Sequence, residues 1–197
     1  MIRPARFPAL ATARLDLRAP VPGDVAQLFE VFADPEVMRY WSTVPMRSAS
    51  EAEAMVALSH EQFVAGTGMR WAVCRRDDAR VMGTLSIFHF DAQNDRAEIG
   101  YALGRAFWGA GYMHEALTAL AAFAFGPMDL RRLEADTDPR NAASIRALER
   151  LGFAREGLLR ERWVVAGVVS DSLLFGLLRA DWAARQGDGA EGVSVQD

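Results

Sequence analysis

The sequence contains no lysine, so arginine provides all 22 of its basic residues. Mechanisms that need a lysine nucleophile or a lysine Schiff base are therefore excluded. The phosphate-binding P-loop is excluded as well, because that motif ends in Gly-Lys-Ser or Gly-Lys-Thr.

Cysteine, metal-ligand spacings and long apolar runs are also lacking. The one cysteine, Cys74, cannot form an internal disulfide, and we expect it to pack in the core of a protein from a reducing compartment. His60, His89 and His114 are widely separated and predict no metal site. No apolar run approaches the roughly 20 residues that span a bilayer, and the N-terminus lacks the apolar segment of a signal peptide. These absences predict a soluble, cytoplasmic protein without a membrane partner.

The composition is that of an ordinary globular protein, with 51% hydrophobic and 24% charged residues in a chain of 197. This length suits one well-buried domain. A net charge of −4 argues against direct binding to nucleic acid. We expect a loose N-terminal arm over residues 1–11, a single domain over 12–185, and a disordered tail over 186–197 that is rich in Gly, Asp, Ser and Gln.

The hydrophobic pattern predicts an α+β domain of order β-α-α-β-β-β-α-β-α-β-β. Capping boxes are expected at Asp24 with Gln27 and at Ser48 with Glu51. The expected strands are 12–19, 70–75, 81–90, 96–103, 130–137, 156–166 and 168–178. The expected helices are 25–33, 48–64, 113–124 and 142–151.

A Gly-x-Gly turn, Trp108-Gly109-Ala110-Gly111-Tyr112, joins the strand at 96–103 to the helix that follows. Two glycines let the backbone approach a ligand closely, and the first N–H groups of a helix favour negative charge. The turn therefore suggests a pyrophosphate site. It is not a dinucleotide fingerprint, because His114 stands where the third glycine belongs. A turn that binds nothing remains open on these residues alone.

A second informative stretch runs from Asp138 to Phe153, D-P-R-N-A-A-S-I-R-A-L-E-R-L-G-F, and joins a strand to a helix. Asn141 lies at the C-terminal end of that strand, where α/β proteins usually bind ligands. Ser144 lies three residues into the helix and faces the same opening. The alternative is that Asn141 is a plain N-cap and Ser144 is helix surface.

Together these motifs resemble the GCN5-related N-acetyltransferase (GNAT) superfamily, and most closely its RimJ/RimL-like branch, which acetylates the N-termini of ribosomal proteins. The resemblance rests on E-I-G-Y-x-L, W-G-x-G-Y, E-A and D-P-x-N-x-x-S-x-x-x-L-E-x-L-G-F in this order, and it covers residues 12–183. It implies a mixed, mostly antiparallel central sheet of about seven strands with helices on both faces. It also implies acetyl-CoA as acyl donor and an amine as acceptor.

The resemblance assigns a coenzyme A site to the Gly-x-Gly turn and its surroundings. The family's pyrophosphate motif, Gln/Arg-x-x-Gly-x-Gly/Ala, maps onto Ala106 to Gly111, and Ala106 departs from it. That departure weakens a side-chain contact to phosphate but leaves the backbone amides in place. The residues implied to bind the cofactor are Ala102, Leu103, Trp108, Gly109, Ala110, Gly111, Tyr112, Met113, Asn141 and Ser144.

For the reaction, the resemblance implies direct transfer, with Glu98 as the base that acts directly or through a water. Glu98 could equally be an ion-pair partner or bind the acceptor amine, and Glu161 and Asp171 are alternative carboxylates. Ser144 is the expected proton donor to the departing thiolate. A backbone N–H near Leu103 is expected to meet the oxyanion.

The predicted function is therefore an N-acetyltransferase, with an acyl-CoA-binding module without turnover as the alternative. The acceptor stays open between a protein N-terminus, an aminoglycoside, a polyamine and an amino acid. Tyr40 and Trp41 lie where the family's acceptor loop lies, and Glu161 and Asp171 are further candidates for acceptor contacts. A homodimer is the commonest assembly and is kept as the expectation.

Overall fold

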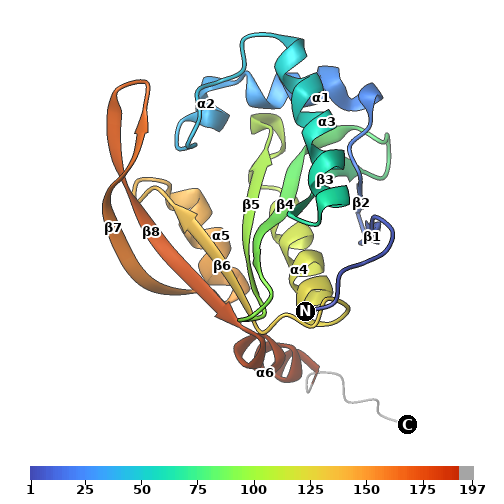
Figure 1. Cartoon of the computed structure of the whole chain (residues 1–197), viewed down its shortest axis with the longest axis vertical. Helices are drawn as coiled ribbons and strands as arrows, with labels where there is room; N and C mark the ends of the chain where they lie inside the picture. The colour runs from blue at the N-terminus through green and yellow to red at the C-terminus, as the bar shows by residue number, and fades with distance from the viewer. Residues whose placement is uncertain (191–197) are drawn as a thin grey trace.

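The computed structural model describes residues 1–190 and contains one eight-stranded sheet of order β1-β2-β3-β4-β5-β6-β8-β7 (Figure 1). The strands are β1 (Leu10–Ala11), β2 (Leu15–Arg18), β3 (Gly68–Arg75), β4 (Val81–Asp91), β5 (Arg96–Leu103), β6 (Arg132–Thr137), β7 (Ala154–Val165) and β8 (Val168–Leu178). The helices are α1 (Val25–Phe32), α2 (Pro35–Met38), α3 (Ala49–Ala65), α4 (Tyr112–Phe125), α5 (Ala142–Leu151) and α6 (Arg179–Ala190). Short 3-10 turns cover Pro22–Asp24 and Arg105–Phe107.

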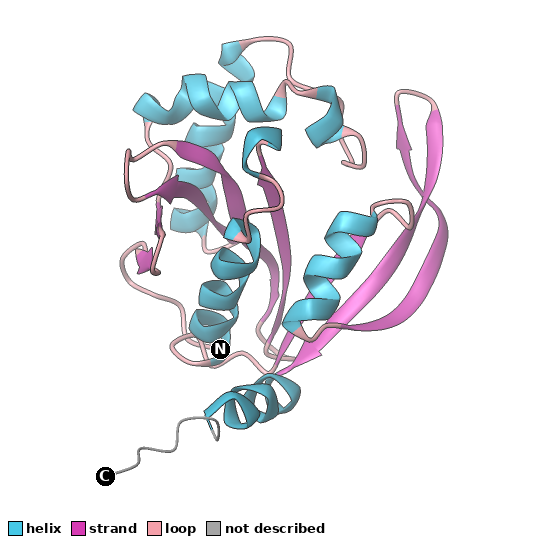
Figure 2. Ribbon diagram, turned by 180° about the vertical axis from the view of Figure 1, so that it is seen from behind, coloured by secondary structure: helices cyan, strands magenta, loops and turns pink. Residues whose placement is uncertain are grey.

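The sheet divides at β5 and β6, its one parallel pair. Arg96–Glu98 pairs with Arg132–Glu134, and beyond these three residues no further pairing joins the two strands. In Figures 1 and 2, β6, β8 and β7 lean away from the rest of the sheet above this point. We call the place where β5 and β6 part the fork.

Two hydrophobic clusters cover the two faces of the sheet. Side chains of α4 and α5, such as Leu117 and Leu148, pack in one cluster. Side chains of α1 and α3, such as Leu28 and Val56, pack in the other. Because strand side chains alternate between faces, Leu103 belongs to the first cluster and its neighbour Ala102 to the second. The predicted α+β architecture with helices on both faces is confirmed.

The N-terminal arm is not loose, which corrects the expectation for residues 1–11. Leu10–Ala11 pairs with β2 and raises the strand count from about seven to eight. Phe7 packs edge-on against Trp71 with ring centroids 5.5 Å apart, and the indole N–H of Trp71 donates to the Pro8 carbonyl at 2.7 Å. Burial of a large indole requires an acceptor for its N–H, and the arm provides it.

The expected tail is shorter at its start, because α6 continues to Ala190 and includes residues 186–190. Residues 191–197 lie outside the described part of the chain. No helix within residues 1–190 combines the length and the apolar character that a membrane crossing requires.

One of the two predicted capping boxes is confirmed. Glu51 Oε1 accepts from the backbone N–H of Ser48 at 3.2 Å. The prediction for Asp24 is wrong, because its carboxylate accepts two bonds from Arg18, each 2.7 Å long, instead of capping α1. The planar guanidinium of arginine can donate to both carboxylate oxygens at once, so it competes successfully with the helix N–H groups.

Candidate active site

A cleft of about 900 Å³ opens on the α1 and α3 face of the sheet and reaches the fork. We call it the fork cleft. Its walls come from the loop after α2, from β3, β4 and β5, from the end of β6, from α5, and from the β7–β8 hairpin. Its polar and aromatic lining includes Tyr40, Trp41, Glu51, Arg70, Ser86, His89, Glu98, Tyr101, Asp136, Asp138, Asn141, Ser144, Trp163 and Ser172. It therefore joins segments that are distant in the sequence.

A second, shallower groove lies at the start of α4, and we call it the α4 groove. Gly109, Ala110, Gly111, His114 and Arg150 are among its lining residues. Gly109 and Gly111 have φ values of 75° and 81°, a conformation that favours glycine. A Cβ added at Gly109 would meet no atom within 4 Å, and one at Gly111 would meet only the Arg14 guanidinium at 3.5 Å. The loop therefore leaves open space in front of its backbone.

The first turn of α4 also has unused hydrogen-bond donors. Helix geometry leaves the first N–H groups without intrahelical acceptors. Gly111 is the N-cap and provides no side-chain bond to them. Open N–H groups, the positive end of the helix dipole and free space in front of them form a cradle that fits a phosphate.

Arg14 contributes a cation to this cradle that the sequence analysis missed. Its guanidinium donates to the Ala110 carbonyl at 3.0 Å and to Glu115 at 2.7 Å, and it stacks 4.5 Å from the centre of the Tyr112 ring. Ala106 provides no such group, and Arg105 forms an ion pair with Asp34 at 3.4 Å. No local signal marks Arg14, because it lies about 96 residues from the loop in sequence.

Glu115 holds the segment before β2 against α4. It accepts from the Thr12 hydroxyl at 2.5 Å, from the Arg14 backbone N–H at 2.8 Å, and from the Arg14 side chain. Burial works to raise the pKa of Glu115, but these bonds outweigh it and leave the pKa below its usual value. Glu115 is therefore a positioning residue that fixes Arg14 beside the loop.

Ser144, Tyr101 and Asn141 form one hydrogen-bonded group at the fork. The Tyr101 and Ser144 hydroxyl oxygens are 2.8 Å apart, and Asn141 Oδ1 accepts from the Ser144 backbone N–H at 3.1 Å. Asn141 caps α5 and also lines the cleft, so an N-cap role and a position at a ligand site are compatible. Burial raises the pKa of Tyr101 to about 12, although the Ser144 bond acts in the opposite direction. Tyr101 therefore keeps its proton at neutral pH.

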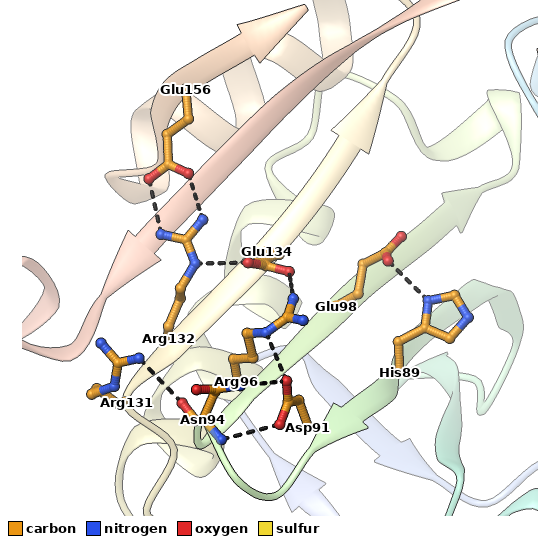
Figure 3. Close-up of polar contacts among 9 residues, drawn as sticks. All are labelled: His89, Asp91, Asn94, Arg96, Glu98, Arg131, Arg132, Glu134 and Glu156. Atoms are coloured by element: carbon orange, nitrogen blue, oxygen red, sulfur yellow. Dashed lines mark hydrogen bonds and ion pairs between the residues drawn. The ribbon is translucent and has the colours of Figure 1, made fainter. Parts of the chain in front are cut away.

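Glu98 is the last residue of β5 that pairs with β6, so it lies directly below the fork. Its Oε2 is 2.9 Å from Nδ1 of His89, a bond that Figure 3 shows. The His89 side chain is 75% exposed and Glu98 is 28% exposed. The carboxylate is therefore inside the cleft while its imidazole partner reaches solvent.

Asp136 is a second residue that the sequence analysis missed. It follows Glu134 on the same face of β6 and lines the fork cleft. Its Oδ2 accepts from the Ser172 hydroxyl at 2.8 Å and from the Trp163 indole N–H at 3.3 Å. Both partners are neutral donors from the hairpin.

The other cleft carboxylates have different roles. Asp138 binds Arg140 at 2.5 Å, Glu98 binds His89, and Glu51 caps α3. Among the described residues, Asp136 is the cleft carboxylate without a basic partner or a capping role. Its negative charge is therefore available to pair with a cationic group of a ligand.

Of the predicted acceptor residues, Tyr40 and Trp41 line the cleft. The Arg140 guanidinium lies 5.8 Å from the centre of the Tyr40 ring, which links the loop after α2 to the start of α5 across the cleft. Trp41 also packs edge-on against Phe32 at 5.5 Å, so it serves the core as well.

Glu161 and Asp171 lie on the hairpin, and neither is among the residues that line the cleft. Asp171 Oδ1 accepts from the Glu161 backbone N–H at 2.8 Å, at a bulge where the β7–β8 register shifts. Their contact with the acceptor stays a prediction.

Ala102, Leu103 and Trp108 complete the predicted cofactor residues. The Ala102 and Leu103 side chains are buried in opposite clusters, so they offer a ligand their backbone. The Leu103 carbonyl is already engaged, because the Trp108 indole N–H donates to it at 2.6 Å. This bond ties the loop to the end of β5. No three His, Cys, Asp or Glu side chains in the described part of the chain gather as a metal site would require.

Comparison with known proteins identifies the family. The model of the acetyltransferase (GNAT) domain family matches residues 14–154. The chain belongs to the GNAT acetyltransferase family. As a member it is an N-acetyltransferase by class, and the fork and the glycine loop are features of its own chain that suit this class.

Relatives of the GNAT protein support this assignment over nearly its whole length. The "Uncharacterized N-acetyltransferase p20" of Bacillus licheniformis is 36% identical over 88% of this chain and 98% of its own. The ribosomal protein uS5-alanine N-acetyltransferase of Escherichia coli is 26% identical over 88% of this chain and 92% of its own. A crystal structure of a GCN5-related N-acetyltransferase from Brucella melitensis has a TM-score of 0.83 at 22% identity, covering 96% of this chain and 86% of that one, and shows the same fold.

Proposed function

We propose that this protein transfers the acetyl group of acetyl-CoA directly to a primary amine that enters the fork cleft. One observation carries the proposal: the fork lies between a phosphate cradle at α4 and a cleft in which the Asp136 carboxylate has only neutral partners. A donor held at the cradle can extend along the open side of β5, while an amine approaches from the α1 and α3 face.

The α4 cradle fits the pyrophosphate of coenzyme A. The N–H groups from Gly109 to Met113 would hold the phosphates, and Arg14 would add the positive charge that Ala106 does not provide. The backbone of Ala102 and Leu103, the Asn141 amide and the Trp108 ring would hold the rest of the arm. Because the binding relies mainly on backbone groups, the unusual residue at position 106 is tolerated.

Acetyl-CoA supplies the acetyl group, which passes from sulfur to the amine nitrogen and leaves an amide and the CoA thiol. Asp136 binds the acceptor while it is an ammonium ion. Glu98 takes the proton that the amine must lose, directly or through a water, and His89 gives this proton a route to solvent. A backbone N–H near Leu103 binds the carbonyl oxygen as negative charge develops on it.

Ser144 and Tyr101 act on the departing thiolate. A thiol has a pKa of about 8.5, so complete proton transfer from a phenol with a pKa of about 12 is uphill. Hydrogen bonds from the Ser144–Tyr101 pair therefore stabilise the thiolate, and a proton from the amine or solvent completes the thiol. The amine itself is a peptide N-terminus, as in the relative that acetylates ribosomal protein uS5, or a small molecule.

Isothermal titration with acetyl-CoA tests the donor site. We expect the unmodified protein to bind, and Gly111→Val to weaken binding at least 100-fold by filling the space before the N–H groups. Gly167→Val is the matched control, because Gly167 has the same φ of 81° and open surroundings but lies in the β7–β8 turn. No heat from the unmodified protein at millimolar acetyl-CoA contradicts the proposal.

Thiol release from acetyl-CoA with a panel of primary amines tests turnover. Release that depends on the amine separates an enzyme from an acyl-CoA-binding module, which would bind without releasing thiol. Light scattering of the same preparation checks the expected homodimer.

A further inference from the structure

Arg70 lies on the floor of the fork cleft in line with the fork. On β3 it pairs with Ser86 of β4, and Ser86 pairs with Gly100 of β5. All three residues line the cleft, so they form one row on one face of the sheet. Gly100 is the end of this row at the fork.

The guanidinium of Arg70 is half-buried and has only neutral partners. Its Nε donates to the Ser86 hydroxyl at 3.3 Å, and its Nη1 donates to the Ser59 hydroxyl of α3 at 3.4 Å. Within residues 1–190 no carboxylate forms an ion pair with it. Burial lowers the pKa of Arg70, and no neighbouring anion offsets this.

A half-buried cation without an anionic partner lowers the stability of the fold, because its charge is partly removed from water. Other half-buried arginines of the chain have carboxylate partners, as Arg132 has Glu134 and Glu156. A neutral residue would bridge Ser86 and Ser59 without the cost of removing a charge from water. The position of Arg70 in the cleft wall lets an anion that enters the cleft compensate this charge.

We propose that the acceptor carries a carboxylate besides its amine, and that Arg70 binds this carboxylate while the amine lies at the fork. This inference rests on the proposed function. Because neighbouring strands are about 5 Å apart and the guanidinium lies over β4, the two groups of the acceptor should be roughly 5 to 8 Å apart. An ω-amino acid of intermediate length meets this requirement, and so does a peptide with an aspartate beside its free N-terminus.

Matched acceptors test the proposal at saturating acetyl-CoA. We expect kcat/KM at least tenfold higher for 5-aminopentanoate than for n-pentylamine, which differs only in the carboxylate. The peptide amides Ala-Asp and Ala-Asn form a second pair, and the pair with the larger ratio shows whether the carboxylate comes from a small molecule or a peptide. Equal kcat/KM values within both pairs would overturn the proposal.

Variants assign the effect to Arg70. Arg70→Gln should remove the preference for the carboxylate by raising KM, leave n-pentylamine within twofold, and leave acetyl-CoA affinity unchanged. Arg70→Lys should restore part of the preference. Arg76→Gln is the control, because it removes an exposed arginine on the turn after β3. A loss shared equally by both acceptors indicates a structural role and overturns the proposal.

A binding measurement keeps the inference testable if no amine in the panel is acetylated. In ¹H–¹⁵N spectra, 5-aminopentanoate should shift the Nε–H signal of Arg70, which Arg70→Gln identifies by its loss. n-Pentylamine should not shift it, and an unmoved signal with both probes would overturn the proposal. Absence of acetyl-CoA binding would instead contradict the proposed function, so the two failures are distinguishable.

Discussion

Two groups of charged side chains near the fork differ in their partners. Below the fork, where the strands pair, Arg96 and Arg132 both bind Glu134, Arg96 also binds Asp91, and Arg132 also binds Glu156 (Figure 3). Above the fork, Asp136 and Arg70 have only neutral hydrogen-bond partners.

We interpret the first group as charges that stabilise the fold and propose that the second group binds a ligand. The ion pairs below the fork lie beside the three paired positions of β5 and β6, and each member is compensated. Asp136 and Arg70 are partly removed from water without an ionic partner, so a ligand of complementary charge gains more there than at a solvent-exposed residue. Glu98 lies at the boundary, and its partner is the exposed imidazole of His89.

Removing the charge of Asp136 is expected to have the largest effect on activity. Asp136→Asn keeps the size of the side chain but loses the ionic bond to the acceptor, which is worth about 1.5 to 3 kcal/mol. We expect kcat/KM for the amine to fall about 10- to 100-fold, mostly through KM, with acetyl-CoA affinity unchanged.

Glu134→Gln is the control for Asp136, because it removes the same charge two residues away. It should lower stability and leave kcat/KM within about threefold. Equal kinetic losses in both variants would mean that the fork does not separate two kinds of charge.

The bounds of β5 and α5 and the glycine loop follow from local sequence. Alternation, glycine and capping signals lie within each segment, so these elements could be predicted from the sequence. The family resemblance then proposed Glu98, Gly111, Asn141 and Ser144 as site residues. Asn141 and Ser144 line the fork cleft, as the opening predicted for them requires.

Arg14, Arg70 and Asp136 could not be found this way. The position of Arg70 depends on its register with Ser86, 16 residues away, and Asp136 depends on Ser172, 36 residues away. Register across a sheet is set by the whole set of strand pairings, and no short pattern reports it. The prediction for Asp24 failed for a different reason, because Arg18, six residues earlier, offers its carboxylate two charge-assisted hydrogen bonds in place of the helix N–H groups.

Replacing Arg132 tests whether the ion pairs below the fork stabilise the fold. Its side chain is 18% exposed and binds two carboxylates. Arg132→Gln should lower the free energy of unfolding by about 2 kcal/mol, between the values for exposed and fully buried ion pairs. Urea unfolding with an unchanged m-value measures this. Arg155→Gln, which breaks the exposed pair with Glu149, should cost less than about 0.5 kcal/mol.

The raised pKa of the Tyr101 hydroxyl can be tested through the stability of the protein at alkaline pH. Its pKa is about 12 in the folded protein and near 10 when unfolded, so the folded state holds its proton longer. The stabilisation is complete below about pH 10 and is lost as pH rises through the folded value. We expect a loss of roughly 1 kcal/mol between about pH 9 and pH 11 that Tyr101→Phe removes.

The sequence has no lysine, so few other groups ionise in that pH range. The loss of stability can therefore be attributed to Tyr101 more easily. The other buried acid there is Cys74, whose pKa burial raises to about 11. Cys74→Ala in the background of both proteins removes its contribution. An identical alkaline loss with and without the Tyr101 hydroxyl would contradict the assignment.

Removing the Ser172 hydroxyl is expected to have the smallest effect, and it tests how Asp136 is held in place. Its hydroxyl donates one of the two bonds that hold Asp136, and Trp163 donates the longer one. Ser172→Ala leaves the charge of Asp136 but loosens its position, so kcat/KM for the amine should fall about three- to tenfold, as loss of one hydrogen bond of about 1 kcal/mol implies. If Asp136 binds the acceptor, the Asp136→Asn, Ser172→Ala double variant should lose no more than Asp136→Asn, because Ser172 then acts through the missing carboxylate. Additive losses would show that Ser172 contacts the acceptor by itself and that Asp136 is not the residue it positions.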